Sequence, residues 1–116
     1  MNLFVEYPKC TTCQKARAWL NERGTAFESR HIKDNPPSRK ELEKWWKKSK
    51  LPLKRFFNTS GILYKELGLS AKLPAMGESE QLDLLATDGM LVKRPILVTP
   101  KGVCAGFKPE IWEQLL

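Results

Sequence analysis

Cys10 and Cys13 stand three positions apart in the stretch YPKCTTCQKARAWL, where a short apolar segment gives way to a helical pattern. A thiol at the first turn of a helix meets backbone N–H groups without partners and the positive end of the helix dipole. Both effects lower the thiol pKa, and the thiolate is the form that attacks disulfides. Lys9 and Lys15 add positive charge nearby. The spacing predicts a redox pair in which Cys10 is the exposed attacking thiol and Cys13 resolves the mixed disulfide.

Two other interpretations of these cysteines stay open. Together with Cys104 and His31 they make up the residue count of a Cys₃His zinc site, although Cys104 and His31 do not form a second close pair. They can also be small apolar residues that pack without chemistry. We favour the redox pair and expect no metal. Cys104 is expected to be a small strand residue, with a role as a third redox partner left open.

The elements that position the cysteines follow from the hydrophobic pattern. Residues 2–6 (NLFVE) are short, apolar and β-prone, and predict a buried first strand. From Thr11 onward, apolar residues recur at helical spacing, and Gly24 suits the end of that helix. Residues 26–32 predict a second strand. Two strands joined by a helix in this way run parallel, with a right-handed crossover.

The middle of the chain is predicted to be helical. Ser38 and Glu41 fit a capping box at the start of one helix. A short helix is expected over residues 64–67. Another is expected over residues 79–89, with Ser79 as a possible N-cap and Gly89 as its stop.

The C-terminal part returns to strands. Residues 94–107 predict a β-hairpin with a Pro-Lys-Gly turn, and Pro109 suits the start of a last helix. The order of elements predicts an α/β fold with a four-stranded mixed sheet flanked by helices. We expect a single domain over residues 1–116, with a helical insertion over about residues 33–89.

Arg94 and Pro95 directly precede the apolar strand of this hairpin. Proline is tolerated at the first position of a strand. If its peptide bond is cis, the preceding backbone can lie against the cysteine turn and pair with an extended substrate. An arginine beside a thiolate stabilises the thiolate or binds an oxyanion through two hydrogen bonds. Arg94 is therefore a candidate catalytic residue.

Composition sets the class of protein. Apolar residues make up 41% and charged residues 28%, which is typical of a globular protein and not of a disordered chain. No apolar run approaches the roughly 20 residues of a membrane-spanning helix. The N-terminal stretch lacks the pattern of a secretion signal, so we expect a cytoplasmic protein that does not bind membranes. Three cysteines, an odd number, argue against a structural disulfide framework.

Charge is concentrated in one place. Residues 39–55 carry eight of the 20 lysine and arginine residues, in a chain of net charge +7. The stretch is interpreted as a solvated helix face, with a docking patch for an acidic partner as the alternative. Direct nucleic-acid binding is not expected, because one basic helix without a recognition motif is weak evidence for it.

Four stretches of the sequence resemble the arsenate reductase (ArsC) family, which also contains the Spx regulators, and they span nearly the whole chain in the family's order: YPKCTTCQKARAWL, YKELGL, LVKRPILVTPKG and GFKPEIWEQLL. The resemblance implies a thioredoxin-like (glutaredoxin-like) fold. It implies that Cys10 is the reactive cysteine, that Cys10 and Cys13 form a redox-active disulfide, and that Pro95 is a cis proline facing Cys10. Thr11, Thr12, Pro95 and Lys108 are the predicted substrate-binding residues.

The sequence departs from the arsenate reductases and from the Spx regulators, and its GFKPEIW ending looks more like an uncharacterised CxxC-containing branch of the family. Glutaredoxin-coupled arsenate reductases bind the oxyanion with three arginines, of which only Arg94 is present here. Asn58, Thr59 and Ser60 occupy the segment of the second arginine, and Lys108 lies near the position of the third. Those enzymes also usually lack the second cysteine of the pair. The Spx regulators carry both cysteines, but they continue in a charged extension beyond the position where this sequence ends.

Two hypotheses follow for function. The first is a cytoplasmic thiol–disulfide oxidoreductase that reduces arsenate or a protein or glutathione disulfide, with no bound cofactor. Glutathione, glutaredoxin or thioredoxin would be its external reductant, and we expect a monomer. The second is a redox-switched regulator similar to Spx that binds the alpha subunit of RNA polymerase. We favour the enzyme.

Overall fold

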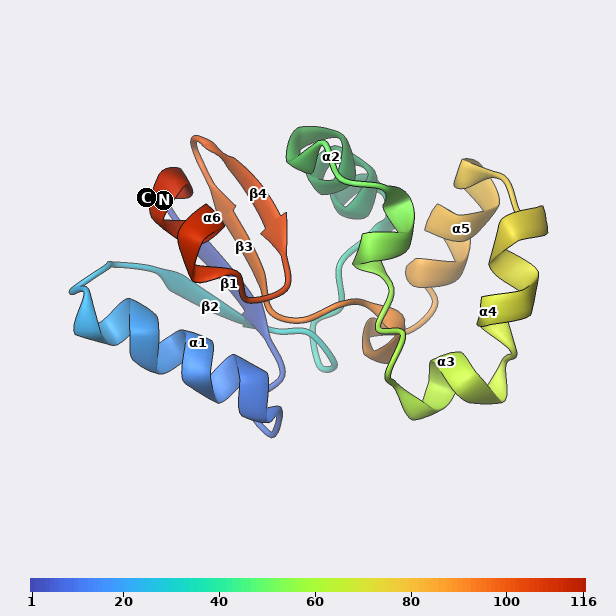
Figure 1. The fold of residues 1–116 in the computed structure, drawn as a ribbon, viewed down its shortest axis with the longest axis horizontal. Helices are drawn as coiled ribbons and strands as arrows, with labels where there is room; N and C mark the ends of the chain where they lie inside the picture. Colours follow the sequence, from blue (N-terminus) through green and yellow to red (C-terminus); the bar gives the residue numbers. More distant parts are fainter.

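The computed structural model describes residues 1–116 and contains one mixed sheet with the strand order β2-β1-β3-β4 (Figure 1). Strands β1 and β2 are parallel, and β3 is antiparallel to both β1 and β4. The predicted four-stranded mixed sheet is therefore confirmed, including the parallel pair joined through a helix. The strands are β1 (Leu3–Glu6), β2 (Glu28–His31), β3 (Ile96–Thr99) and β4 (Gly102–Ala105).

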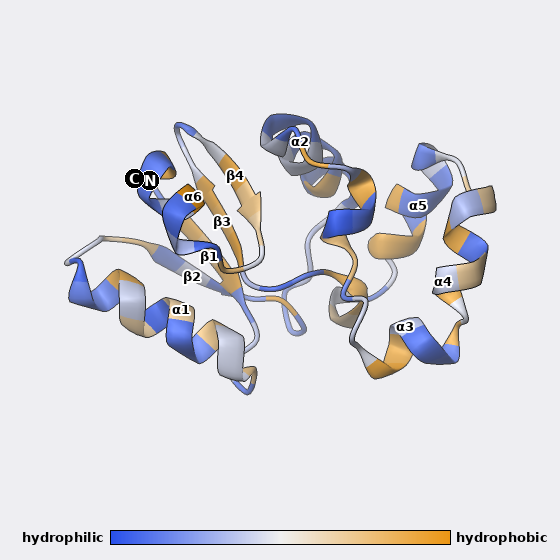
Figure 2. Ribbon diagram, viewed as in Figure 1, coloured by the Kyte–Doolittle hydropathy of each residue, from blue (hydrophilic) through white to orange (hydrophobic).

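One face of the sheet is covered by α1 (Thr11–Glu22) and α6 (Pro109–Leu115). Because side chains alternate along a strand, each central strand sends every second residue to this face. Figure 2 shows how hydrophobic β1, β3 and β4 are. The residues buried together here are Phe4, Ala16, Leu20, Leu97, Cys104 and Trp112.

The opposite face packs against α2 (Arg39–Ser49) and the helices that follow it. Strand residues Val5, Ile96 and Val103 join Leu42 and Trp45 of α2 in a core of 17 buried residues. This core is the larger of the two, because it extends from the sheet into the helical middle of the chain.

The helical middle lies to one side of the sheet in Figure 1, and the molecule measures 42 × 27 × 24 Å along its principal axes. No helix is both long and apolar enough to cross a membrane. After α2 the elements are η1 (Leu53–Phe56), α3 (Ile62–Glu66), α4 (Leu69–Lys72), η2 (Leu73–Ala75), α5 (Glu78–Leu85) and η3 (Gly89–Leu91).

The start of α2 is as predicted. The Ser38 hydroxyl accepts a hydrogen bond from the Glu41 N–H at 3.1 Å, and the Glu41 carboxylate accepts one from the Ser38 N–H at 3.0 Å. This reciprocal pair is a capping box. The predicted hairpin turn and the start of α6 at Pro109 are also confirmed.

The predicted bounds of the helix over residues 79–89 are wrong. Helix α5 starts at Glu78 with Gly77 as its N-cap, and it ends at Leu85. Ser79 does not cap the helix, because it lies inside the first turn; its hydroxyl accepts a hydrogen bond from Arg39 at 2.8 Å. Gly89 has a different role from the predicted helix stop: a Cβ atom there would overlap the carbonyl oxygen of Ile32. Only glycine lets the chain pass this close to the end of β2.

Candidate active site at the start of helix α1

Cys10 is the N-cap residue of α1 and has an extended backbone conformation. Its N–H donates a hydrogen bond to the Tyr7 carbonyl at 2.9 Å, and its carbonyl accepts one from the Gln14 N–H at 3.0 Å. The Gln14 side chain donates to the Pro8 carbonyl at 3.0 Å, which ties the turn to the helix. The predicted strand–turn–helix thus places the Cys10 thiol at the positive end of α1.

The two cysteines are free thiols in different environments. Cys10 is half-buried, which by itself disfavours the thiolate. Hydrogen bonds from the Cys13 backbone and thiol, from Arg94 and from the Thr12 backbone outweigh burial and lower the pKa of Cys10. Cys13 is fully buried. Burial, reinforced by the neighbouring Cys10 thiolate, raises the pKa of Cys13 to about 12. The pair therefore consists of one thiolate-prone thiol and one protonated thiol.

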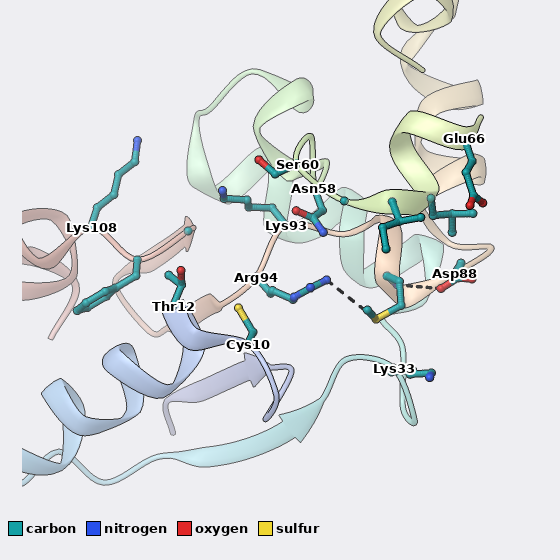
Figure 3. A pocket seen from close by; sticks show the side chains of 16 residues that line it. Cys10, Thr12, Lys33, Asn58, Ser60, Glu66, Asp88, Lys93, Arg94 and Lys108 are labelled. Carbon is teal, nitrogen blue, oxygen red and sulfur yellow. Dashed lines mark hydrogen bonds between the residues drawn. The ribbon is translucent and has the colours of Figure 1, made fainter. Parts of the chain in front are cut away.

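Arg94 reaches the cysteine turn from the residue before Pro95, and the Arg94–Pro95 peptide bond is cis, as the resemblance implies. In Figure 3 the Arg94 side chain begins beside the Cys10 sulfur and extends away from it across the pocket. The guanidinium lies over the Tyr7 ring, with Cζ 5.0 Å from the ring centroid, and it is one of the groups that lower the pKa of Cys10. Its Nη1 atom is 4.0 Å from the Met90 sulfur. Tyr7 and Met90 thus hold the guanidinium in place.

A pocket of about 830 Å³ opens in front of Cys10 (Figure 3). It is formed where the cysteine turn meets three distant segments, residues 58–66, 88–94 and 106–108. Its lining contains four cationic side chains and two carboxylates, so the charged groups around the pocket carry a net positive charge. The charged lining residues are Lys33, Lys93, Arg94, Lys108, Glu66 and Asp88.

Four of the predicted site residues line this pocket: Cys10, Thr12, Arg94 and Lys108. The other three do not. Cys13 and Pro95 are buried, and Thr11 is exposed as the first residue of α1.

Sequence reasoning did not select Tyr7, Lys93 or Met90 as site residues. Tyr7 lies between the first strand and the cysteines, and Lys93 lies beside Arg94, so proximity to a predicted residue was the available signal. Nothing local marks Met90, which contacts Arg94 only because η3 folds against the site.

The residues of the zinc hypothesis do not converge. No three histidine, cysteine, aspartate or glutamate side chains lie close enough together to hold a metal ion. The His31 Nδ1 atom accepts hydrogen bonds from the N–H groups of Lys33 and Asp34, both at 3.2 Å. Cys104 lies in the core under α1 and α6, where burial raises its pKa, and its thiol donates to the Gly106 carbonyl at 3.6 Å. Cys104 is the small strand residue that the sequence predicts.

Comparisons with protein families, with curated proteins and with solved structures all point to the same family. The ArsC family model matches residues 5–115. The uncharacterized protein YusI of Bacillus subtilis is 51% identical over 111 residues, which cover 96% of this chain and 94% of YusI. The global transcriptional regulator Spx of Streptococcus mutans is 30% identical over 110 residues, covering 95% of this chain and 78% of Spx. The crystal structure of an ArsC family related protein from Bacteroides fragilis superimposes with a TM-score of 0.97 at 56% identity, covering 99% of this chain and 97% of that one. With this match and a thioredoxin-like sheet, the chain belongs to the ArsC family.

Proposed function

We propose that this protein is a thiol–disulfide oxidoreductase in which Cys10 attacks a disulfide and Cys13 resolves the intermediate. One observation carries the proposal: a half-buried thiol of lowered pKa at a helix start opens onto a pocket, beside a buried thiol of raised pKa. This asymmetry matches the two roles, because the attacking sulfur must be a thiolate and accessible, and the resolving sulfur must not compete with it.

The reaction proceeds in two exchanges. The Cys10 thiolate attacks one sulfur of the substrate disulfide, the substrate S–S bond breaks, and one thiolate leaves. Cys13 then gives up its proton and attacks the Cys10 sulfur, which releases the second substrate thiolate. The substrate gains two electrons and becomes two thiols, and the protein holds a Cys10–Cys13 disulfide. Glutathione, or a glutaredoxin or thioredoxin, would restore the dithiol in a reducing compartment such as the cytoplasm.

The other candidate residues have supporting roles in this scheme. Arg94 stabilises the Cys10 thiolate. Thr12 and Lys108, on the pocket wall, contact the substrate. Pro95 fixes the backbone that carries Arg94 beside the cysteine turn.

The first test is a glutathione redox titration with peptide mapping. We expect a Cys10–Cys13 disulfide with a potential of roughly −200 to −270 mV, the range of thioredoxins and glutaredoxins. Disulfide reductase activity should disappear in Cys10→Ser. Cys13→Ser should accumulate the mixed disulfide on Cys10. Cys104→Ser is the matched control and should keep both the disulfide and the activity. Full activity of Cys10→Ser would refute the proposal.

Arsenate is a second candidate substrate. The Cys10 thiolate would displace an arsenate oxygen as water and form an S–As(V) bond. Attack of Cys13 on the Cys10 sulfur would then break that bond, release arsenite and leave the same Cys10–Cys13 disulfide. Arg94 and Lys108 line the pocket together with Asn58 and Ser60, so the wall offers cations and hydrogen-bond donors to an oxyanion. Because a lysine lacks the planar fork of an arginine, we propose slower turnover of arsenate than of disulfides. A coupled assay with arsenate as the only oxidant measures this directly.

The regulator is the alternative function, and the 30% identity to Spx supports it. In that case oxidation of the cysteine pair would change affinity for the alpha subunit of RNA polymerase. Binding of reduced and oxidised protein to the purified C-terminal domain of the alpha subunit tests this. Absence of binding in both redox states would exclude it.

A further inference from the structure

A second cavity, of about 520 Å³, adjoins the Cys10 pocket. Lys93 and Lys108 line both cavities, so the two are neighbours that share a wall. Figure 3 shows these two lysines among the side chains around the Cys10 pocket. The lining of the second cavity consists of Pro52, Lys54, Arg55, Phe57, Thr59, Lys93, Ala105 and Lys108. We call it the basic pocket.

The basic pocket has four cationic side chains and no carboxylate in its lining. Lys54 and Arg55 come from η1, Lys93 from the segment before β3, and Lys108 from the N-cap of α6. None of the four forms an ion pair. By contrast, Arg39 pairs with Asp83 and Lys47 with Glu43 in the same basic stretch. The basic pocket thus collects cations that the protein itself does not neutralise.

We propose that the basic pocket binds the phosphate groups of a low-molecular-weight thiol, and that the disulfide of such a thiol is the substrate of Cys10. This inference rests on the proposed oxidoreductase function. A single carboxylate needs only one arginine or lysine. A phosphomonoester carries nearly two negative charges at pH 7 and three strong acceptor oxygens, so it can engage several cations at once. Arg55 adds a guanidinium suited to phosphate oxygens.

The arrangement of the two cavities suits one ligand that spans both. Its sulfur would lie at Cys10, its middle between Lys93 and Lys108, and its phosphates near Lys54 and Arg55. Phe57 and Ala105 back the cavity wall but are only 1% and 4% exposed, so the cationic side chains supply the contacts to the ligand. The exchange itself is unchanged: reduced protein and one disulfide give oxidised protein and two thiols.

Coenzyme A disulfide and pantethine form a matched pair of probes, because pantethine has the same reacting disulfide without the phosphate-bearing nucleotide. Oxidation of the reduced protein by each is followed in single turnovers at low salt, without added reductant. We expect coenzyme A disulfide to react at least about tenfold faster than pantethine, as electrostatic steering predicts. Glutathione disulfide is the third probe and supplies carboxylates in place of phosphates.

Two double variants with the same loss of charge isolate the pocket. Lys54→Gln with Arg55→Gln removes two cations of the basic pocket, and the coenzyme A to pantethine ratio should fall close to one. Lys44→Gln with Lys48→Gln removes two exposed lysines of α2 that line neither cavity, and the ratio should persist.

Several outcomes would overturn the inference. The first is a ratio of coenzyme A disulfide rate to pantethine rate near one in the unmodified protein. The second is an equal fall of this ratio in the two double variants. The third is a rate with glutathione disulfide that depends on Lys54 and Arg55 as strongly as the rate with coenzyme A disulfide does. If no disulfide oxidises the protein, the oxidoreductase proposal fails by itself. Calorimetry with adenosine 3′,5′-bisphosphate then tests whether the basic pocket binds phosphate groups. Binding to the unmodified protein that is lost in the Lys54 and Arg55 double variant supports a phosphate site, and absence of binding to the unmodified protein refutes it.

Discussion

At the scale of single residues, the Cys10 and Cys13 side chains differ because one helical turn separates a helix end from a helix interior. Cys10 keeps access to the pocket and receives hydrogen bonds from its own helix and from Arg94. Cys13 is enclosed, and burial keeps it protonated. The thiolate fraction of Cys10 therefore rises with pH around a pKa below the ordinary cysteine value, whereas burial raises the pKa of Cys13 to about 12 and keeps it a thiol at neutral pH.

Arg94→Gln tests the charge beside Cys10. Arg94 is one of the groups that lower the pKa of Cys10, so its removal raises that pKa, and alkylation of Cys10 by iodoacetamide at pH 7 should slow by about threefold. Peptide mass spectrometry against pH measures the profile, whose midpoint should move to higher pH. Lys93→Gln is the control, because it removes a neighbouring charge that does not bond Cys10. Equal slowing in the two variants would show that net charge, and not the contact, sets the reactivity.

At the scale of elements, the helical middle is anchored to the sheet by side chains at helix ends. Arg30 of β2 donates to both carboxylate oxygens of Glu41, at 2.6 and 2.9 Å. Arg30 also donates to the carbonyls of Asn35 and Pro36, both at 2.9 Å. Arg39 joins α2 to α5 through Asp83 at 2.6 Å. The hydrogen bond of this aspartate raises the pKa of Arg39. These contacts hold α2 against β2 and α5 against α2. They are needed because helices this short are not stable by helix propensity alone.

Glu41→Gln should remove a pH-dependent part of the protein's stability. The Arg30 hydrogen bonds, helped by the Ser38 N–H, lower the pKa of Glu41 from 4.5 to about 2. A carboxylate whose pKa is lowered by folding stabilises the protein above its unfolded pKa, and the gain is lost as pH falls toward the folded pKa. Because the Glu41 side chain is 37% exposed, we expect a loss of only about 1 kcal/mol at pH 7. The loss should vanish near pH 2.

Urea unfolding of both proteins between pH 2 and pH 7 measures the effect. Glutamine retains the side-chain acceptor of the capping box, so the comparison isolates the charge. Glu22→Gln, exposed at the end of α1, is the control and should change stability by less than about 0.5 kcal/mol at any of these pH values. A difference for Glu41→Gln that persists at pH 2 would mean that charge is not the cause.

At the scale of the whole molecule, the sheet separates two cores, and the site lies where the sheet meets the helical middle. Neither part forms the pocket alone, because Cys10 and Lys108 belong to the sheet side and Asn58 and Ser60 to the helical middle. Cys104, in contrast, lies in the core under α1 and α6 and is 1% exposed. Its reactivity therefore reports opening of the fold as a whole.

Cys104 should react with a thiol reagent at least about a thousandfold more slowly than Cys10 in native buffer, because a core residue becomes accessible only in rare unfolding events. Burial also raises its pKa, which lowers its thiolate fraction even when water reaches it. Labelling followed by peptide mapping measures both rates, and urea should accelerate Cys104 selectively. Similar rates for the two thiols in native buffer would contradict this assignment and reopen a redox role for Cys104.

The features that the sequence alone determined are local. The strand, turn and helix around Cys10 and Cys13, the capping box at Ser38, and the C-terminal hairpin each follow from neighbouring residues. Their hydrogen bonds and alternating side chains act over only a few positions. The mixed sheet follows as well, because connection rules restrict how such elements assemble.

Tertiary structure alone decided which side chains meet at the site. Packing of η1, η3 and the segment before β3 brings Lys54, Arg55 and Lys93 together with Lys108, and it places Met90 against Arg94. Packing also pairs Ser79 with Arg39 instead of leaving it as the predicted N-cap. It requires glycine at position 89 because of the Ile32 carbonyl, where the local pattern predicted only the end of a helix. Contacts between segments this far apart in the chain depend on how whole helices pack, and no short sequence pattern encodes that.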